Sequence, residues 1–93
     1  MIQHIVMWSL KAPADAPRFK ALLDTCQGIS PGMLGFEVGI KTDGLEANVD
    51  VVLISSFTDA AALAAYVVHP AHQAVLGELG AMRASRHVLD FNA

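Results

Sequence analysis

The segment from Tyr66 to His72 carries the residues best suited to chemistry, because a phenol and two imidazoles surround a proline there. Pro70 ends any helix that precedes it but is favourable in the first turn of a helix that follows, so the segment predicts a break between two helices. A histidine can exchange a proton near neutral pH, and a tyrosine hydroxyl can donate to an oxygen that gains negative charge. The pair would suit proton abstraction next to a carbonyl.

Helical spacing predicts where these side chains point. His72 begins a stripe spaced i, i+3, i+4, i+7, which continues with Val75, Leu76 and Leu79. Tyr66 follows Leu63 by one i, i+3 step on the preceding helix. We therefore expect Tyr66 and His72 to reach one pocket between helices and sheet. The residues expected to line that pocket are Val6, Trp8, Phe19, Leu23, Val51 and His69.

The rest of the chain supplies four strands and the helices that would position this pocket. Residues 2–10 are apolar on both parities, 33–40 alternate, 49–57 are a β-branched run, and 86–91 close the chain. Asp15 can cap a helix whose apolar residues are Phe19, Leu22, Leu23 and Cys26, and Thr58 or Asp59 can cap an Ala-rich helix through Val68.

This order of elements predicts an α+β, ferredoxin-like βαββαβ fold with a four-stranded antiparallel sheet and its helices on one face. The other face would be bare and apolar, which is more exposed apolar area than a monomer leaves in water. We expect it to pair with a second copy as a dimeric α/β barrel. The residues expected on this face are Ile5, Met7, Val52, Ile54, Leu89 and Phe91.

Length and composition restrict the remaining possibilities. The 93 residues predict one domain, 1–93, and 54% of them are hydrophobic while only 16% are charged. A net charge of −3 with scattered lysines and arginines argues against nucleic acid as a partner. One cysteine, no signal peptide and no long apolar run favour a cytoplasmic protein that does not span a membrane.

Three stretches of the chain together resemble the stress-responsive A/B barrel domain family, often called Dabb. They are Ile2-Gln3-His4-Ile5-Val6, the Tyr-x-x-His-Pro-x-His segment at 66–72, and Val88-Leu89-Asp90-Phe91. The resemblance covers nearly the whole chain, and the middle segment is its most specific part. It implies the fold predicted above, whereas functions in the family differ: some members are stress-associated, and one is a polyketide cyclase of the olivetolic acid type.

The resemblance to that cyclase implies catalytic roles for Tyr66 and His72, with His4 and Asp90 in support. By strand parity His4 and Asp90 both belong beneath the helices, so Asp90 would either hold His72 in one tautomer or form a local bond. Lys20 and Leu23 stand where the cyclase has an aromatic residue, so the same substrate is not implied.

Two classes of function remain open from the sequence. The first is a cofactor-free, cyclase-like lyase that acts on a small apolar carbonyl compound, and it requires a ligand-sized cavity reached by His72. The second is a non-catalytic stress-responsive or ligand-binding dimer, in which His72 would be a core histidine, Tyr66 a packed aromatic, His4 a plain strand residue and Asp90 a strand-end cap. A cofactor-independent monooxygenase or isomerase ranks below both. No metal is expected, because His69 and His72 have no clear third ligand.

Overall fold

The order of helices and strands agrees with the βαββαβ prediction. The protein is described by a computed structural model that covers residues 1–93. Its elements are β1 (Ile2–Leu10), a short 3-10 helix η1 (Pro13–Asp15), α1 (Ala16–Asp24), β2 (Met33–Ile40), β3 (Val51–Phe57), α2 (Ala60–Val67), α3 (Pro70–Met82) and β4 (Arg83–Asn92). Pro70 divides the second helical crossover in two, as its lack of an N–H and its fixed φ require.

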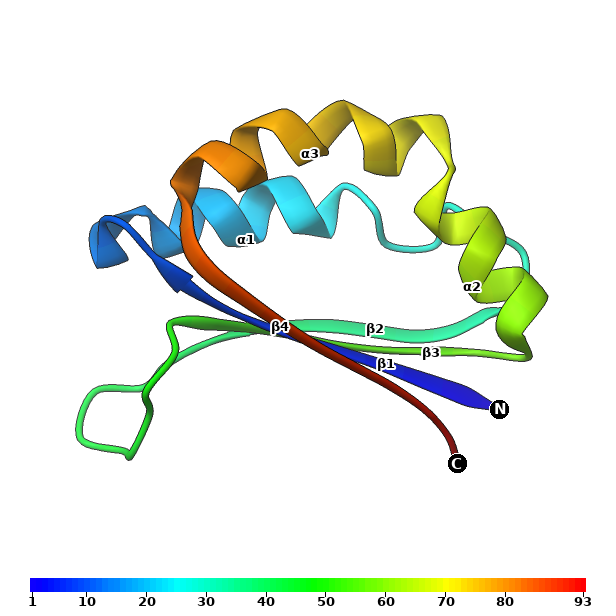
Figure 1. Ribbon diagram of the computed structural model, residues 1–93, viewed down its shortest axis with the longest axis horizontal. Helices are drawn as coiled ribbons and strands as arrows, with labels where there is room; N and C mark the ends of the chain where they lie inside the picture. Colours follow the sequence, from blue (N-terminus) through cyan, green and yellow to red (C-terminus); the bar gives the residue numbers. More distant parts are fainter.

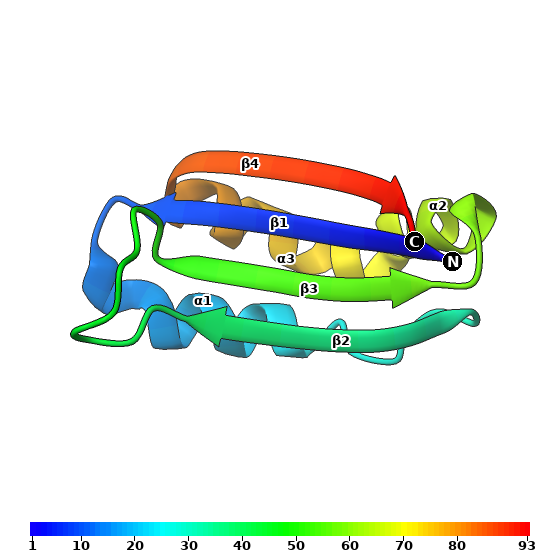
Figure 2. The ribbon, with the colours of Figure 1, turned by 90° about the horizontal axis from the view of Figure 1, so that it is seen from below.

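The four strands form one antiparallel sheet in the order β2-β3-β1-β4. β1 lies in the centre, with Val6 opposite Leu53 on one side and Val88 on the other. Figure 1 shows the helices on one face of the sheet. Figure 2, in which the molecule is seen from below, shows that no helix covers the other face. This is the ferredoxin-like arrangement.

The hydrophobic core fills the space between the sheet and the helices. Val6, Trp8 and Leu53 contribute the sheet side, and Phe19 and Leu23 contribute the α1 side. Trp8 and Phe19 meet edge to face, with ring centroids 5.0 Å apart. The alternation of β1 therefore sorts its residues as predicted, with the even-numbered ones from His4 to Leu10 buried.

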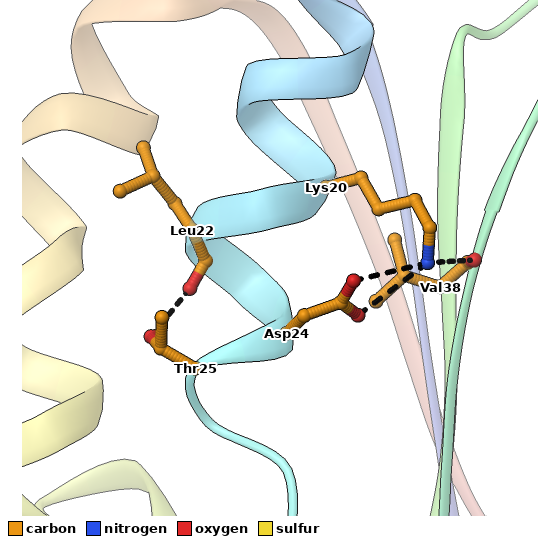
Figure 3. A network of polar contacts seen from close by, with 5 residues as sticks. All are labelled: Lys20, Leu22, Asp24, Thr25 and Val38. Atoms are coloured by element: carbon orange, nitrogen blue, oxygen red, sulfur yellow. Dashed lines mark hydrogen bonds and ion pairs between the residues drawn. The ribbon is translucent and has the colours of Figure 1, made fainter.

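α1 is also fastened to the sheet by a polar contact at its outer edge. Lys20 Nζ donates to the Val38 carbonyl of β2 at 3.2 Å and pairs with Asp24 at 3.1 Å, while the Thr25 hydroxyl donates to the Leu22 carbonyl where the helix ends (Figure 3). Lys20 thus lies over β2, away from the space beneath α3. Asp15 occupies the N-cap position of α1, but its side chain accepts no hydrogen bond from the helix.

β4 is the least covered strand of the sheet. It starts at Arg83, three residues earlier than predicted, and nearly all of its residues are exposed. The residues predicted for the bare face stand on it: Met7, Ile54, Leu89 and Phe91 are exposed, and Ile5 and Val52 are half-buried. No helix is long and apolar enough to cross a membrane.

Candidate functional site

A cavity of about 350 Å³ lies beneath α3, between that helix and strands β1, β3 and β4. This volume is at the small end of the range found for ligand pockets in proteins. Six of the predicted site residues line it: His4, Val6, Trp8, Leu23, Tyr66 and His72. The helix break and the central strand therefore bring the Tyr/His segment and the first strand to one place.

The imidazole of His72 is oriented by the main chain. Its Nδ1 lies 2.9 Å from the Val67 carbonyl oxygen. In an unbroken helix this carbonyl would accept from the amide of Ala71, but that amide donates to His69 Nδ1 at 3.0 Å instead. The break at Pro70 therefore leaves the Val67 carbonyl to accept from His72 Nδ1–H and also from Gln73 Nε2 at 2.8 Å, while Nε2 of His72 keeps its lone pair.

Burial decides the charge of His72. It lowers the pKa of the imidazole, the hydrogen bond to Val67 opposes this shift, and the charges of His4 and Arg86 lower the pKa further. The ring is therefore neutral at pH 7, which is the form that can accept a proton.

Tyr66 stands beside His72, with ring centroids 4.8 Å apart. Only 1% of the residue is exposed, and its hydroxyl makes no hydrogen bond of ordinary geometry, its one polar neighbour being the buried Cys26 thiol, which is a weak partner. Burial raises the pKa of the phenol well above its usual range, and the neighbouring Cys26 thiol adds to the shift. A buried hydroxyl without a partner costs about 1–3 kcal/mol, so an acceptor that reached it would be bound favourably.

His4 and Asp90 form a pair of their own. They are directly opposite each other in the β1–β4 register, and His4 Nδ1 contacts Asp90 Oδ1. The local alternative for Asp90 therefore holds, and the carboxylate does not touch His72. The His4 ring lies edge-on to the Tyr66 ring, with centroids 6.4 Å apart, so the His4–Asp90 pair adjoins the phenol.

Three residues predicted for the pocket lie outside its lining. Phe19 and Val51 are fully packed in the core against α1 and the sheet, where Trp8 separates Phe19 from the cavity side. His69 is the N-cap of α3, and its ring is used to accept the Ala71 amide. The prediction for these three was wrong: an inward-facing position on a strand or helix places Val51 and Phe19 in the core without showing where the cavity opens, and the cap position of His69 turns its ring to the main chain.

The sequence did not single out five residues that line the cavity: Leu53, Val67, Gly80, Arg83 and Arg86. Leu53 could have been found, since it pairs with Val6 in the register. Arg83 is the first residue of β4, and Arg86 lies in its first half, where polar and apolar residues do not alternate. No periodic pattern therefore indicated that these two side chains line the cavity.

Sequence and structure comparisons identify the relatives of this chain. The model of the stress responsive A/B barrel domain (Dabb) matches residues 2–93. No curated protein shows significant sequence similarity. A dimeric ferredoxin-like protein of unknown function from Jannaschia sp. CCS1 is 30% identical, with a TM-score of 0.81 and coverage of 99% of this chain and 98% of that one.

Two further solved structures share the fold at lower identity. A Dabb family protein from Mesorhizobium loti is 21% identical, with a TM-score of 0.80 and coverage of 99% and 95% of the two chains. SnoaB, a cofactor-independent oxygenase from Streptomyces nogalater, is 18% identical, with a TM-score of 0.79 and coverage of 99% and 91%. Since the family model spans all but the first residue, the chain belongs to the stress responsive A/B barrel domain family.

Proposed function

We propose that the cavity beneath α3 catalyses proton transfer at the carbon next to a carbonyl of a small apolar compound, as a cyclase-like lyase would require. One observation carries this proposal: the hydroxyl of Tyr66 is buried without a partner beside a His72 ring whose Nδ1 is occupied. The rings of Tyr66 and His72 are neighbours and both residues line the cavity, which supports a pairing of hydrogen-bond donor and general base.

His72 is the general base in this proposal. Val67 accepts from Nδ1–H, so Nε2 removes the proton from the substrate carbon and the ring becomes cationic. The lowered pKa keeps the base in its free form at neutral pH. The rate of proton transfer should therefore rise with pH, with its midpoint below the ordinary histidine pKa of about 6.5.

Tyr66 is the donor to the oxygen. As the proton leaves the carbon, negative charge moves to the carbonyl oxygen, and the phenol donates to this enolate. Its raised pKa keeps the phenol protonated. After reaction of the enolate, His72 returns its proton, so no cofactor is needed to balance the step.

The test follows the exchange of α-protons for deuterium. Acetophenone is incubated with the protein in D₂O near neutral pH, and loss of its methyl signal is followed by proton NMR. His72→Gln should reduce the protein-dependent rate by about 10²- to 10⁴-fold. Tyr66→Phe should reduce it by about 10- to 100-fold, the value of a hydrogen bond to a charged group.

His69→Asn is the matched control, because it removes the other histidine of the segment while asparagine retains a side-chain acceptor at the N-cap of α3. It should leave the exchange rate unchanged. A rate that is equal in wild type and His72→Gln would refute the base, and equal loss in all three variants would indicate a folding defect.

The alternative is a non-catalytic protein that binds a small apolar ligand in the same cavity. Its support is the lining, in which apolar side chains such as Leu53, Leu76 and Leu79 predominate. Saturable shifts of the acetophenone signals without deuterium exchange would favour this alternative.

We also propose that two copies pair through the open sheet face. This face exposes Met7, Ile54, Leu89 and Phe91, and the relative from Jannaschia sp. CCS1 is described as dimeric. Each such side chain contributes about 1.5–3 kcal/mol if it is fully buried, and two-fold symmetry doubles the number buried.

We propose a cytoplasmic location, because the single cysteine, Cys26, is free and buried, as suits a reducing compartment. Fractionation of cells that express the tagged chain would test this location.

A further inference from the structure

A bulge in β4 gives the cavity a second polar feature besides the Tyr66/His72 pair. In the β1–β4 register Arg86 is opposite Trp8 and Arg83 is opposite Leu10, with an irregularity between Ser9 and Leu10. Residues three apart on a regular strand point to opposite faces. The extra residue in β4 cancels this, so both arginines share the helix-facing side with buried Trp8 and Leu10.

Neither arginine has a partner within the protein. The ion pairs of the chain are His4–Asp90, Arg18–Glu78, Lys20–Asp24 and Lys41–Asp50. No hydrogen bond of a side chain involves Arg83 or Arg86, yet both line the cavity.

The charge of the cavity contrasts with that of the chain. The chain carries a net charge of −3, but no aspartate or glutamate lines the cavity, and its two arginines are the only residues there with a permanent charge. The carboxylates of β4 and α3 contact other residues: Asp90 contacts His4, and Glu78 contacts Arg18. An anion would therefore find two exposed, unpaired guanidinium groups at the rim of a cavity whose other lining residues carry no permanent charge.

The two polar features are attached at different positions along the sheet. His4, which adjoins Tyr66, and Trp8, which is opposite Arg86, are four residues apart on β1, about 13 Å along a strand. Apolar side chains of α3, including Leu76 and Leu79, line the same cavity. Arginine binds carboxylates through two parallel N–H···O bonds, which fixes orientation as well as charge.

We propose that Arg83 and Arg86 bind the carboxylate of the ligand, so that the compounds recognised here are small apolar carboxylic acids. This deepens the proposed function, since it rests on the cavity being the ligand site, but it does not depend on any reaction. In a substrate of this class, the carboxylate at the arginines would direct a distant carbonyl toward Tyr66 and His72. The effect of Arg86 on the pKa of His72 agrees with its guanidinium facing the same cavity.

The test compares two probes of the same shape, 4-phenylbutanoate and 4-phenylbutanamide, by calorimetry or ligand-observed NMR. Wild type should bind the carboxylate at least about 10-fold more tightly than the amide, which corresponds to one charge-assisted contact. The preference should weaken as sodium chloride is raised, because salt screens exposed charges. In the Arg83→Gln/Arg86→Gln double variant both probes should bind equally.

Two further variants separate charge from geometry and from general effects. The double Arg→Lys variant keeps the charge but loses the planar fork, so its preference should be intermediate. Arg18→Gln removes an arginine that is paired with Glu78 outside the cavity, and it should behave as wild type. Equal binding of the two probes to wild type, no binding of either at millimolar concentration, or a preference that survives the double Arg→Gln change would overturn the proposal.

The outcomes for the two proposals are distinguishable. Carboxylate preference without deuterium exchange would remove the reaction and keep the anion site. Exchange of acetophenone that is intact in the double Arg→Gln variant, together with equal binding of both probes to wild type, would keep the reaction and remove the anion site.

Discussion

Alternate residues of β1 belong to the two faces of the sheet, which are both apolar but differ in how far their side chains are exposed. His4, Val6 and Trp8 lie beneath the helices and are 7%, 1% and 5% exposed, whereas Met7 on the other face is 41% exposed. The open face continues with Ile54 at 43%, Phe91 at 44% and Leu89 at 64%. Both faces are apolar, so hydrophobicity alone does not show which face the chain itself buries. The crossover helices do, because both connections return over the same side.

The covered face also differs within itself. Around α1 the packing is continuous, with Phe19 and Cys26 fully buried, while beneath α3 the cavity remains. A partner protein would cover the open face, whereas a ligand would fill the cavity. Substitutions in these regions should therefore differ in size and in their dependence on a partner.

Phe57→Ala should destabilise the fold by about 3–5 kcal/mol, because Phe57 is fully buried between His4 and Tyr66 and its removal leaves a void. Phe91→Ala is the matched change on the open face. Its cost should depend on protein concentration, since the ring is buried only by a partner. Urea unfolding at two concentrations measures both, and a large, concentration-independent loss for Phe91→Ala would contradict the comparison.

Ile54→Lys should shift the protein from dimer to monomer. Ile54 is opposite Ile5 at the centre of the open face, so a lysine there would bring a charge into each half of the interface. The loss is about 1.5–3 kcal/mol for each buried isoleucine. Sedimentation velocity gives the mass. Val68→Lys, at the end of α2 on the helix side of the sheet, is the control and should remain dimeric.

Asp50→Asn should cost about 1–3 kcal/mol at pH 7, because the buried carboxylate accepts the Leu10 amide at 2.7 Å and pairs with Lys41 at 3.0 Å. These contacts, the Leu10 bond first, lower the pKa of the Asp50 carboxyl. Its contribution is therefore complete above the unfolded pKa of about 3.9 and is lost as pH falls through the lower folded value.

Unfolding free energies measured between pH 2 and 7 test the sign of this effect. The difference between wild type and Asp50→Asn should shrink below pH 4. Asp43→Asn, in the same connection but without these contacts, should show no such difference. A gap that widens in acid would contradict the assignment.

Asp90→Asn should have the smallest effect, about 0–1 kcal/mol on stability, because 44% of the Asp90 side chain is exposed. Since His72 is oriented by Val67 and not by Asp90, deuterium exchange should fall by less than about 10-fold. Exchange rates of Asp90→Asn and His72→Gln, measured side by side, check this. Equal losses in the two variants would indicate that Asp90 acts together with His72 in the reaction.

Much of this arrangement could be predicted from patterns of side chains. The parity of β1, the stripe from His72 to Leu79 and the break at Pro70 placed the two faces and the Tyr/His segment. Pocket lining was harder, since parity gives a face but not a position along it, and Phe19 and Val51 were misplaced for this reason. The role of the Val67 carbonyl could not be predicted, because every residue carries such a group and only the broken helix frees this one.

The orientation of His72 by a main-chain carbonyl has a consequence for how this protein can diverge. No substitution of the Val67 side chain removes the acceptor, and the proline that exposes it is outside the cavity. Relatives can therefore exchange nearly every side chain around the ligand, and so change what is bound, while the imidazole keeps its tautomer. The proline ring at position 70 therefore keeps the orientation of the His72 imidazole independent of the side chains that line the cavity.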